Sequence, residues 1–274
     1  MFRSIHRSLV AAAVSSSFLA FFSGCDKDKS ESAALAPSAS ALAPSKAAPS
    51  SKVVKFTIDP KGKTAIDMEA PKEHIKATTD SAAGTLEVDL MNLANTRGEV
   101  KVDLSTLKTS TFNDASKDSA QTGHALTWLE VADAEKEKLP DEVKTQNRYA
   151  VFAIRSVDGL NASDLSKVEA STSGSGDEVK TVSLVAHGEF LLHGRKMNKD
   201  IPLEVSFRVA SGSAKDAIPT QIDVTTKSPF SVILAEHDVK PRDSFGKIAK
   251  GAFNLFGTKV AETAKITMEM HARP

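Results

Sequence analysis

Two histidines could bind a metal if the chain brought them together, but their spacing opposes it. His187 and His193 lie in the run AHGEFLLHG, whose alternating apolar residues indicate one strand. Both are odd-numbered and so belong to its outward face, about 20 Å apart at 3.3 Å per residue. Zinc ligands lie within about 2.3 Å of the ion. We therefore expect no shared metal, and place His193 at the end of a strand, with Arg195 and Lys196 in the turn that follows.

A third histidine, His237, is flanked by Glu236 and Asp238. Consecutive side chains diverge along a strand, so only a loop could direct all three at a metal or a proton. The alternative is a polar connection between a strand and a helix, which we predict. The sequence contains no HExxH, CxxC or Walker A motif, and STSGSGDE at 171–178 is typical of a hairpin loop. We expect no catalytic residue and no metal site, although scattered Asp, His and Ser residues leave a weak hydrolase or isomerase open.

The single cysteine, Cys25, follows a basic start with Arg3 and Arg7, an apolar run from 9 to 22, and the small residues Ser23 and Gly24. This layout is typical of an export signal, and the run is too short for a membrane span of about 20 residues. FFSGC also resembles the lipobox of bacterial lipoproteins, which implies lipidation of Cys25. The alternative is plain secretion. We predict a signal peptide at 1–24 and a lipoprotein anchored on the periplasmic side of a bacterial envelope, in either membrane.

Residues 25–51 read as a tether, and the folded domain is expected at 52–274. The stretch DKDKSESAALAPSASALAPSKAAPSS consists mainly of Ala, Ser and Pro without an apolar period. Such a segment cannot offset its ordering entropy by burial, so we predict disorder.

Within the domain, apolar residues alternate with polar ones in eight segments, which predicts antiparallel strands with one face inward. They are 54–58, 86–90, 100–104, 150–154, 182–192, 203–209, 222–226 and 264–270. The predicted fold is an all-β antiparallel barrel of about eight strands. Residues 114–131 are expected to form a loop and short helix, 133–147 a solvated charged insert, and 243–257 an amphipathic helix. That helix would cover one end of the barrel or, alternatively, contact a membrane.

The inward set of this barrel is almost entirely aliphatic, aromatic or Met. An eight-stranded barrel is either filled by side chains or holds one narrow ligand, and the sequence leaves both open. If a ligand is held, we expect it against Leu86, Val88, Leu90, Phe152, Ile154, Leu184, Phe190, Leu192, Val205, Phe207, Ile222, Val224, Ile266, Met268 and Met270.

The order of motifs resembles the YceI-like family over about residues 53–272. The segments that carry the resemblance are FTID (56–59), GTLEVDL (84–90), VKVDLSTLKTS (100–110), HALTWLEV (124–131), RYAVFAIRSV (148–157) and GEFLLHGRKMNKDIPLEV (188–205). The resemblance implies a lipocalin-like barrel that binds a polyisoprenoid or another long lipid chain, without agreed catalytic residues.

Composition excludes one class of partner. Lys plus Arg equals Asp plus Glu at 35 each, and the chain has one Trp and one Tyr, so nucleic acid is not expected. We expect a carrier of an isoprenoid, prenyl quinone or fatty chain, with any headgroup near Arg195, Lys196, Lys240 or Arg242. We expect no resident cofactor. The alternative is a ligand-free envelope adaptor, and a homodimer is left open.

Overall fold

The chain folds into a β-rich domain, and a computed structural model describes residues 52–133, 137–244, 247–248 and 259–274. The strands are β1 (Val53–Ile58), β2 (Lys63–Ala70), β3 (Glu73–Thr79), β4 (Ala83–Asp89), β5 (Arg97–Asp103), β6 (Lys108–Thr109), β7 (Tyr149–Asp158), β8 (Ala170–Thr172), β9 (Glu178–Leu192), β10 (Arg195–Val209), β11 (Gln221–Thr226), β12 (Phe230–Ile233), β13 (Arg242–Ser244), β14 (Lys247–Ile248) and β15 (Thr263–Arg273). The helices are α1 (Ala115–Trp128) and α2 (Asp141–Asn147), with 3₁₀ turns η1 (Leu93–Asn95), η2 (Leu104–Thr106), η3 (Leu165–Lys167) and η4 (Leu234–His237).

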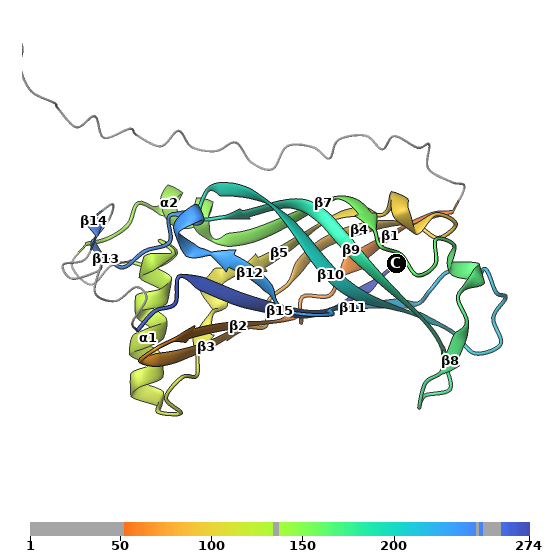
Figure 1. Cartoon of the computed structure of the whole chain (residues 1–274), viewed down its shortest axis with the longest axis horizontal. Helices are drawn as coiled ribbons and strands as arrows, with labels where there is room; N and C mark the ends of the chain where they lie inside the picture. The colour runs from red at the N-terminus through yellow and green to blue at the C-terminus, as the bar shows by residue number, and fades with distance from the viewer. Residues whose placement is uncertain (1–51, 134–136, 245–246, 249–258) are drawn as a thin grey trace, which may run out of the picture. The chain divides into compact units, whose positions relative to one another are not determined.

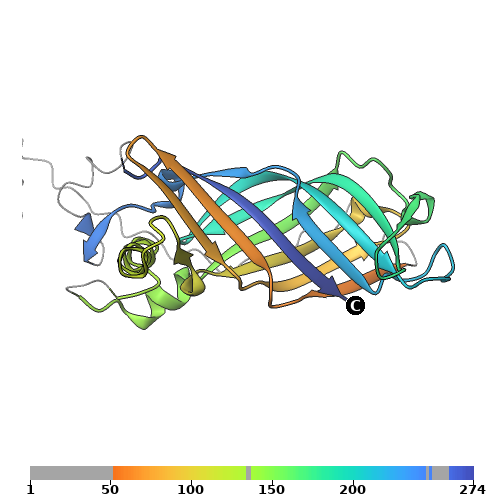
Figure 2. The same cartoon turned by 90° about the horizontal axis from the view of Figure 1, so that it is seen from below.

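Eight of these strands close into a ring. Their order is β1-β4-β5-β7-β9-β10-β11-β15, and β15 pairs back to β1 through Thr57 with Arg273 and Ile58 with Ala272. Every neighbouring pair is antiparallel. The predicted all-β, lipocalin-like barrel is therefore confirmed, and the eight strands of the ring are the eight that alternation predicts. Figures 1 and 2 show the elongated barrel from two sides.

The last strand, β15, belongs to two pairings along its length. Its second half lies between β11 and β1, whereas its first half lies between β12 and β2. Strand β2 continues into β3, and β3 pairs with β6 beyond the end of β5. The β2–β3 hairpin is thus inserted beside β15 at one end of the barrel only. At that end the wall includes β2, β3 and β12 in addition to the strands of the ring.

Alternation along the two longest strands separates the interior from the surface. In β9 the even-numbered residues from Lys180 to Leu192 are buried, while the odd-numbered residues are partly exposed. In β10 the odd-numbered residues from Ile201 to Val209 are buried. Burying one large aliphatic or aromatic side chain contributes about 1.5–3 kcal/mol, so this pattern fixes the strand register.

Helix α1 lies across the end of the barrel where the β2–β3 hairpin is inserted (Figures 1 and 2). Asp114 begins the helix because its carboxylate accepts hydrogen bonds from the Ser116 and Lys117 amides, both at 3.0 Å. Thr109 in β6 fastens the helix to the sheet, since its hydroxyl donates to the Asp118 carbonyl at 2.7 Å and its amide donates to Thr122 Oγ1 at 3.0 Å.

Outside the barrel, one expectation gains detail and another needs correction. The charged insert contains helix α2, which begins after Pro140, a residue whose fixed φ suits a helix start. At 243–257 the structure has a short hairpin instead of a helix start, with Arg242 paired to Ile248 and Ser244 to Lys247. The apolar stripe of the predicted helix covers only the 12 residues 245–256, a length at which helix formation is marginal, so strand pairing can replace its first turn.

The rest of that predicted helix, 249–257, lies outside the described residues, as do the signal peptide at 1–24 and the tether at 25–51 with Cys25. Within the described part of the chain, no helix has the length and hydropathy to cross a membrane.

Candidate functional site: an apolar cavity beneath helix α1

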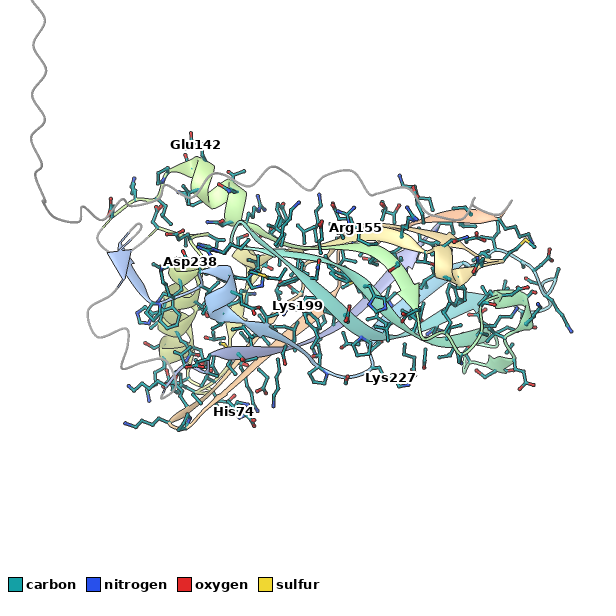
Figure 3. The ribbon with its side chains drawn as sticks, turned by 45° about the horizontal axis from the view of Figure 1, so that its top comes forward. His74, Glu142, Arg155, Lys199, Lys227 and Asp238 are labelled. Atoms are coloured by element: carbon teal, nitrogen blue, oxygen red, sulfur yellow. The ribbon has the colours of Figure 1, made fainter. Side chains whose placement is uncertain are left out.

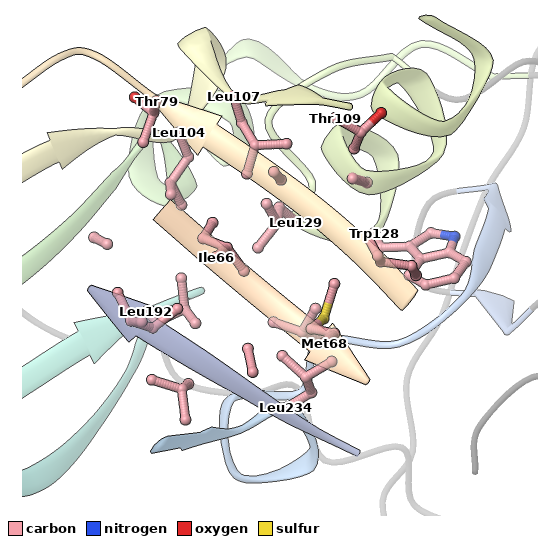
Figure 4. A pocket seen from close by; sticks show the side chains of 18 of the residues that line it. Ile66, Met68, Thr79, Leu104, Leu107, Thr109, Trp128, Leu129, Leu192 and Leu234 are labelled. Carbon is pink, nitrogen blue, oxygen red and sulfur yellow. The ribbon is translucent and has the colours of Figure 1, made fainter. Parts of the chain in front are cut away.

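The barrel encloses a cavity of about 410 Å³ at the end that α1 covers. Figure 4 shows its wall, in which Leu and Ile side chains meet Met68 and Trp128. Ligand pockets in proteins measure about 300–1,000 Å³ and are mostly apolar with a few polar groups. The size and chemistry of this space are therefore those of a binding site for a small apolar molecule.

Its wall comes mainly from the inserted hairpin, the helix and the segment around η4. The hairpin provides Ile66, Met68, Ile75 and Ala77; α1 and the following residue provide Ala125, Trp128 and Leu129; β12, η4 and the next residues provide Phe230, Val232, Leu234 and Val239. Leu104 and Leu107 line it from the bend between β5 and β6.

Polar groups on the wall are few, and several are already paired. The Thr79 hydroxyl lies 2.5 Å from that of Thr106, and the Thr109 hydroxyl donates to the α1 backbone. Thr79 and Thr109 therefore line the cavity, but their hydroxyl hydrogens are already used in hydrogen bonds. At its edge, Gln121 Nε2 donates to Glu73 Oε1 at 2.6 Å. His124 and Lys259 also line the space, so its polar functional groups gather near α1 and residue 259.

The other half of the barrel is closely packed. The space enclosed there measures about 60 Å³. Gly188 explains part of this packing, because a Cβ there would lie 2.2 Å from the Ala153 carbonyl oxygen and 2.9 Å from Phe152 Cε2. The missing side chain lets β7 approach β9 and lets the Phe152 ring occupy the interior. Met268 alone among the predicted lining residues borders both spaces.

The predicted lining residues divide unevenly between the two halves. Four border the large cavity: Phe190, Leu192, Ile266 and Met268. Eleven border the small space: Leu86, Val88, Phe152, Ile154, Leu184, Val205, Phe207, Ile222, Val224, Met268 and Met270. Leu90 borders neither and lies beside a shallow surface pocket near Lys52. Most of the residues expected to hold a ligand are therefore packed core.

The cavity residues that alternation did not single out had a weaker signal. Ile66 and Met68 alternate with Asp67 and Glu69, and after Pro71 the sequence HIKATT continues the same period. Thr and Ala occupy many of the inward positions, so the segment looks too polar for a buried strand. Inward positions facing an open space need not be large, which is why the hydrophobic signal is weak where the cavity lies.

His193 is buried rather than outward-facing. It takes a left-handed backbone conformation, φ 48°, and with Gly194 forms the tight turn between β9 and β10. Its Nε2 lies 2.8 Å from a carboxylate oxygen of Glu130, and its Nδ1 lies 3.1 Å from the His237 carbonyl oxygen. A carbonyl only accepts, so Nδ1 carries a hydrogen. The His193 imidazole therefore joins the β9–β10 turn to the end of α1 and to η4.

His237 is fully buried at the end of η4. Its Nδ1 donates to the carbonyls of Leu192 and Arg195 at 3.3 and 3.2 Å. Its Nε2 has no hydrogen-bond partner among the described residues, and its ring meets Phe190 edge to face at 5.5 Å. Burial lowers the pKa of His237 below its ordinary value, so the imidazole is neutral. The prediction of a polar connection fits this geometry, although η4 is followed by an extended segment rather than a helix.

His187 lies on the outer surface, between Asp158 at 2.8 Å and Asp200 at 2.6 Å. The two neighbouring carboxylates, first Asp158 and then Asp200, raise the pKa of His187. Other charged side chains also lie on the barrel exterior, and Arg155, Lys199 and Lys227 are labelled in Figure 3. His187 is therefore part of a charged cluster on the outer surface of the barrel and does not reach the cavity.

One group of possible metal ligands occurs among the described residues, formed by Asp67, Glu69 and His74 on the β2–β3 hairpin. His74, labelled in Figure 3, already contacts Asp67 at 2.7 and 2.8 Å, and Lys265 lies 3.5 Å from Glu69. Asp67 thus has a histidine partner and Glu69 a lysine partner, as expected of an exposed cross-strand cluster of polar side chains.

Three of the four basic residues expected near a headgroup do not line the cavity. Arg195 and Lys196 begin β10 instead of forming the turn, because the turn needs only His193 and Gly194. Neither they nor Lys240 line the cavity, and the side chain of Arg242 is outside the described part of the chain. A headgroup would instead meet Glu73, Gln121, His124 or Lys259.

Comparison with known proteins gave structural likenesses but no sequence match. No family model matches the chain, and neither does any curated protein. A polyisoprenoid binding domain from Saccharophagus degradans, implicated in plant cell wall breakdown, is similar at 14% identity and a TM-score of 0.46, covering 80% of this chain and 97% of that one. Burkholderia cenocepacia BcnA is similar at 9% identity and a TM-score of 0.47, covering 78% and 98%.

Proposed function

We propose that this chain is a binding protein that shelters the apolar chain of a lipid inside its barrel. The observation that carries the proposal is the cavity of about 410 Å³, whose wall is almost entirely hydrocarbon. Removal of apolar surface from water yields about 25 cal/mol per Å², so such a wall favours an apolar occupant.

The wall also accounts for how a lipid would enter. Helix α1 covers the cavity with Ala125, Trp128 and Leu129, and the polar edge at Gln121 and His124 lies on the same helix. A lipid would insert its chain beneath α1 and leave its headgroup at this edge. The chemistry is sequestration, with no bond made or broken.

The class of lipid and the place of action rest on the sequence. The resemblance to the YceI-like family favours a polyisoprenoid or prenyl quinone over other chains. The apolar segment before Cys25 and its FFSGC context favour export and lipid anchoring. The protein would then hold its cargo beside the membrane that supplies it.

The test compares lipids retained by the full chain and by a cavity-filling variant. After mild purification, native mass spectrometry and organic extraction should reveal one lipid per barrel in the wild type. Ala77→Trp, buried in the cavity wall, should abolish retention, and Ala170→Trp, exposed on β8, should not. A wild-type chain that is empty and takes up neither fatty alcohols nor prenyl quinones would contradict the proposal and favour the ligand-free adaptor.

A further inference from the structure

The division of the barrel interior into two unequal spaces bears on ligand length. The cavity of about 410 Å³ stops where the packed half begins, and the space beyond measures about 60 Å³. A cavity of about 150 Å³ binds one benzene, or six carbons. In proportion, the larger space holds about 16 carbons and the smaller one cannot hold a benzene.

The boundary is built from opposite walls. Phe152 is on β7 and Met268 is on β15, and these strands are four positions apart in the ring of eight, so they face each other across the barrel. Phe152 is buried in the packed half, where it fills the volume left by Gly188. Met268 borders both spaces. Met268 therefore forms the floor of the cavity, and Phe152 fills space in the packed half beyond it.

The residues below the floor resist a longer ligand. Val182, Ile201 and Ile222 have no exposed surface, and interiors packed in this way do not yield space without strain. At the other end, α1 and Lys259 bound the cavity among the described residues, so the cavity volume sets the space available there. The packed half and the boundary at α1 limit the length of any single apolar chain, whether it is a straight fatty chain or an isoprenoid.

We propose that the barrel selects an apolar chain of about 16 carbons, with Met268 setting its length and Phe152 closing the packed half beyond it. The inference rests on the proposed function and narrows it, since it distinguishes a medium-length chain from the longest polyisoprenoids. Straight fatty chains and short isoprenoids both offer an apolar hydrocarbon chain of this length, so both are candidate ligands.

Two ligand series test the proposal and distinguish these sources. Saturated fatty alcohols of about 8 to 24 carbons and isoprenoid alcohols of about 15 to 40 carbons would be delivered from cyclodextrin to the delipidated full chain carrying Cys25→Ser, which cannot be acylated there. Dissociation constants come from competition with a fluorescent fatty alcohol. We expect the dissociation constant to fall about fourfold per added methylene up to about 16 carbons and then to remain level.

Substitutions at the floor should move this break point. Met268→Ala joins the two spaces and should shift the break to longer chains by about four carbons. The matched control is Met270→Ala, which removes the same side chain two residues further along β15 and borders only the small space. It should leave the break point unchanged.

A third variant keeps the test decisive if Met268→Ala does not fold. Ala264 is buried and lines the large cavity, so Ala264→Leu fills part of it and should move the break about three carbons shorter. Affinity that continues to rise through the longest chains, or a break that neither Met268→Ala nor Ala264→Leu moves, would overturn length selection and leave lipid binding standing. No binding of any chain would overturn both proposals.

Discussion

His193 Nε2 lies 2.8 Å from a carboxylate oxygen of Glu130, a residue 63 positions away in the sequence. Glu130 follows the end of α1 and His193 forms the β9–β10 turn, so the contact joins the cavity cover to the barrel wall. Both residues, and Asp238 after η4, have left-handed backbone conformations with φ between 48° and 55°. Such conformations persist in non-glycine residues where surrounding contacts hold them.

Removing the carboxylate tests how strongly this contact holds the domain. Glu130→Ala leaves His193 Nε2 buried without this partner and should lower the free energy of unfolding by about 2–3 kcal/mol. Glu130→Gln should cost less than about 1 kcal/mol, because its amide can either donate to or accept from Nε2. Urea unfolding of the two variants measures the difference. Equal stability of Glu130→Ala and wild type would show that the contact is dispensable.

The two histidines with shifted pKa values should respond to pH in opposite directions. Burial depresses the pKa of His237, so the unfolded chain binds the proton more readily. The stability that depends on neutral His237 is complete above its ordinary value of 6.5 and is lost as the pH falls below it. His237→Asn should flatten the fall of unfolding free energy on the acid side of 6.5.

His187 should make the free energy of unfolding depend on pH in the opposite direction. Asp158 and Asp200 raise its pKa, so its contribution is complete below the ordinary value and is lost as the pH rises through the raised value. The effect should be small because the group is partly exposed and screened. In wild type, the urea midpoint should decline as the pH rises above the ordinary histidine value, and in His187→Asn this decline should be smaller. The same pH dependence in both variants and wild type would refute these assignments.

The N-terminus of α1 should control how quickly a ligand escapes. Asp114→Ala removes the two cap hydrogen bonds and should cost about 1 kcal/mol, most of it as easier opening of α1. We expect faster dissociation of a bound fluorescent lipid in stopped-flow measurements, with a smaller change in Asp114→Asn, which retains a capping oxygen. An unchanged dissociation rate in Asp114→Ala would mean that the ligand leaves by another route.

Two glycines should respond oppositely to alanine. Gly188→Ala places a Cβ against the Ala153 carbonyl and Phe152, which should destabilise the barrel by at least about 1–3 kcal/mol. Gly123 is in α1, where an added Cβ meets nothing within 4 Å. Gly123→Ala should therefore stabilise the domain by about 0.5–1 kcal/mol. Thermal unfolding distinguishes the two, and destabilisation by Gly123→Ala would indicate a contact that the fold does not show.

The sequence predicts the closed ring better than it predicts the cavity. Val182, Leu184 and Ala186 lie on a strand buried on one face and solvated on the other, so alternation is strong wherever the barrel is packed. The cavity wall at Ala77 and Thr79 faces open space, where small and polar-edged residues suffice. His193 was misplaced for a different reason: its burial depends on Glu130, a contact between distant segments that no local period records.

The double pairing of β15 has a kinetic consequence. Ile58 pairs with Ala272, and Asp67 pairs with Lys265, so both ends of the barrel depend on one strand that lies far along the sequence from its partners. Contacts between such distant segments require loop closure before they yield stability, and proteins rich in them fold slowly. The barrel therefore closes late in folding, and the domain should reach the native state over milliseconds to seconds rather than microseconds.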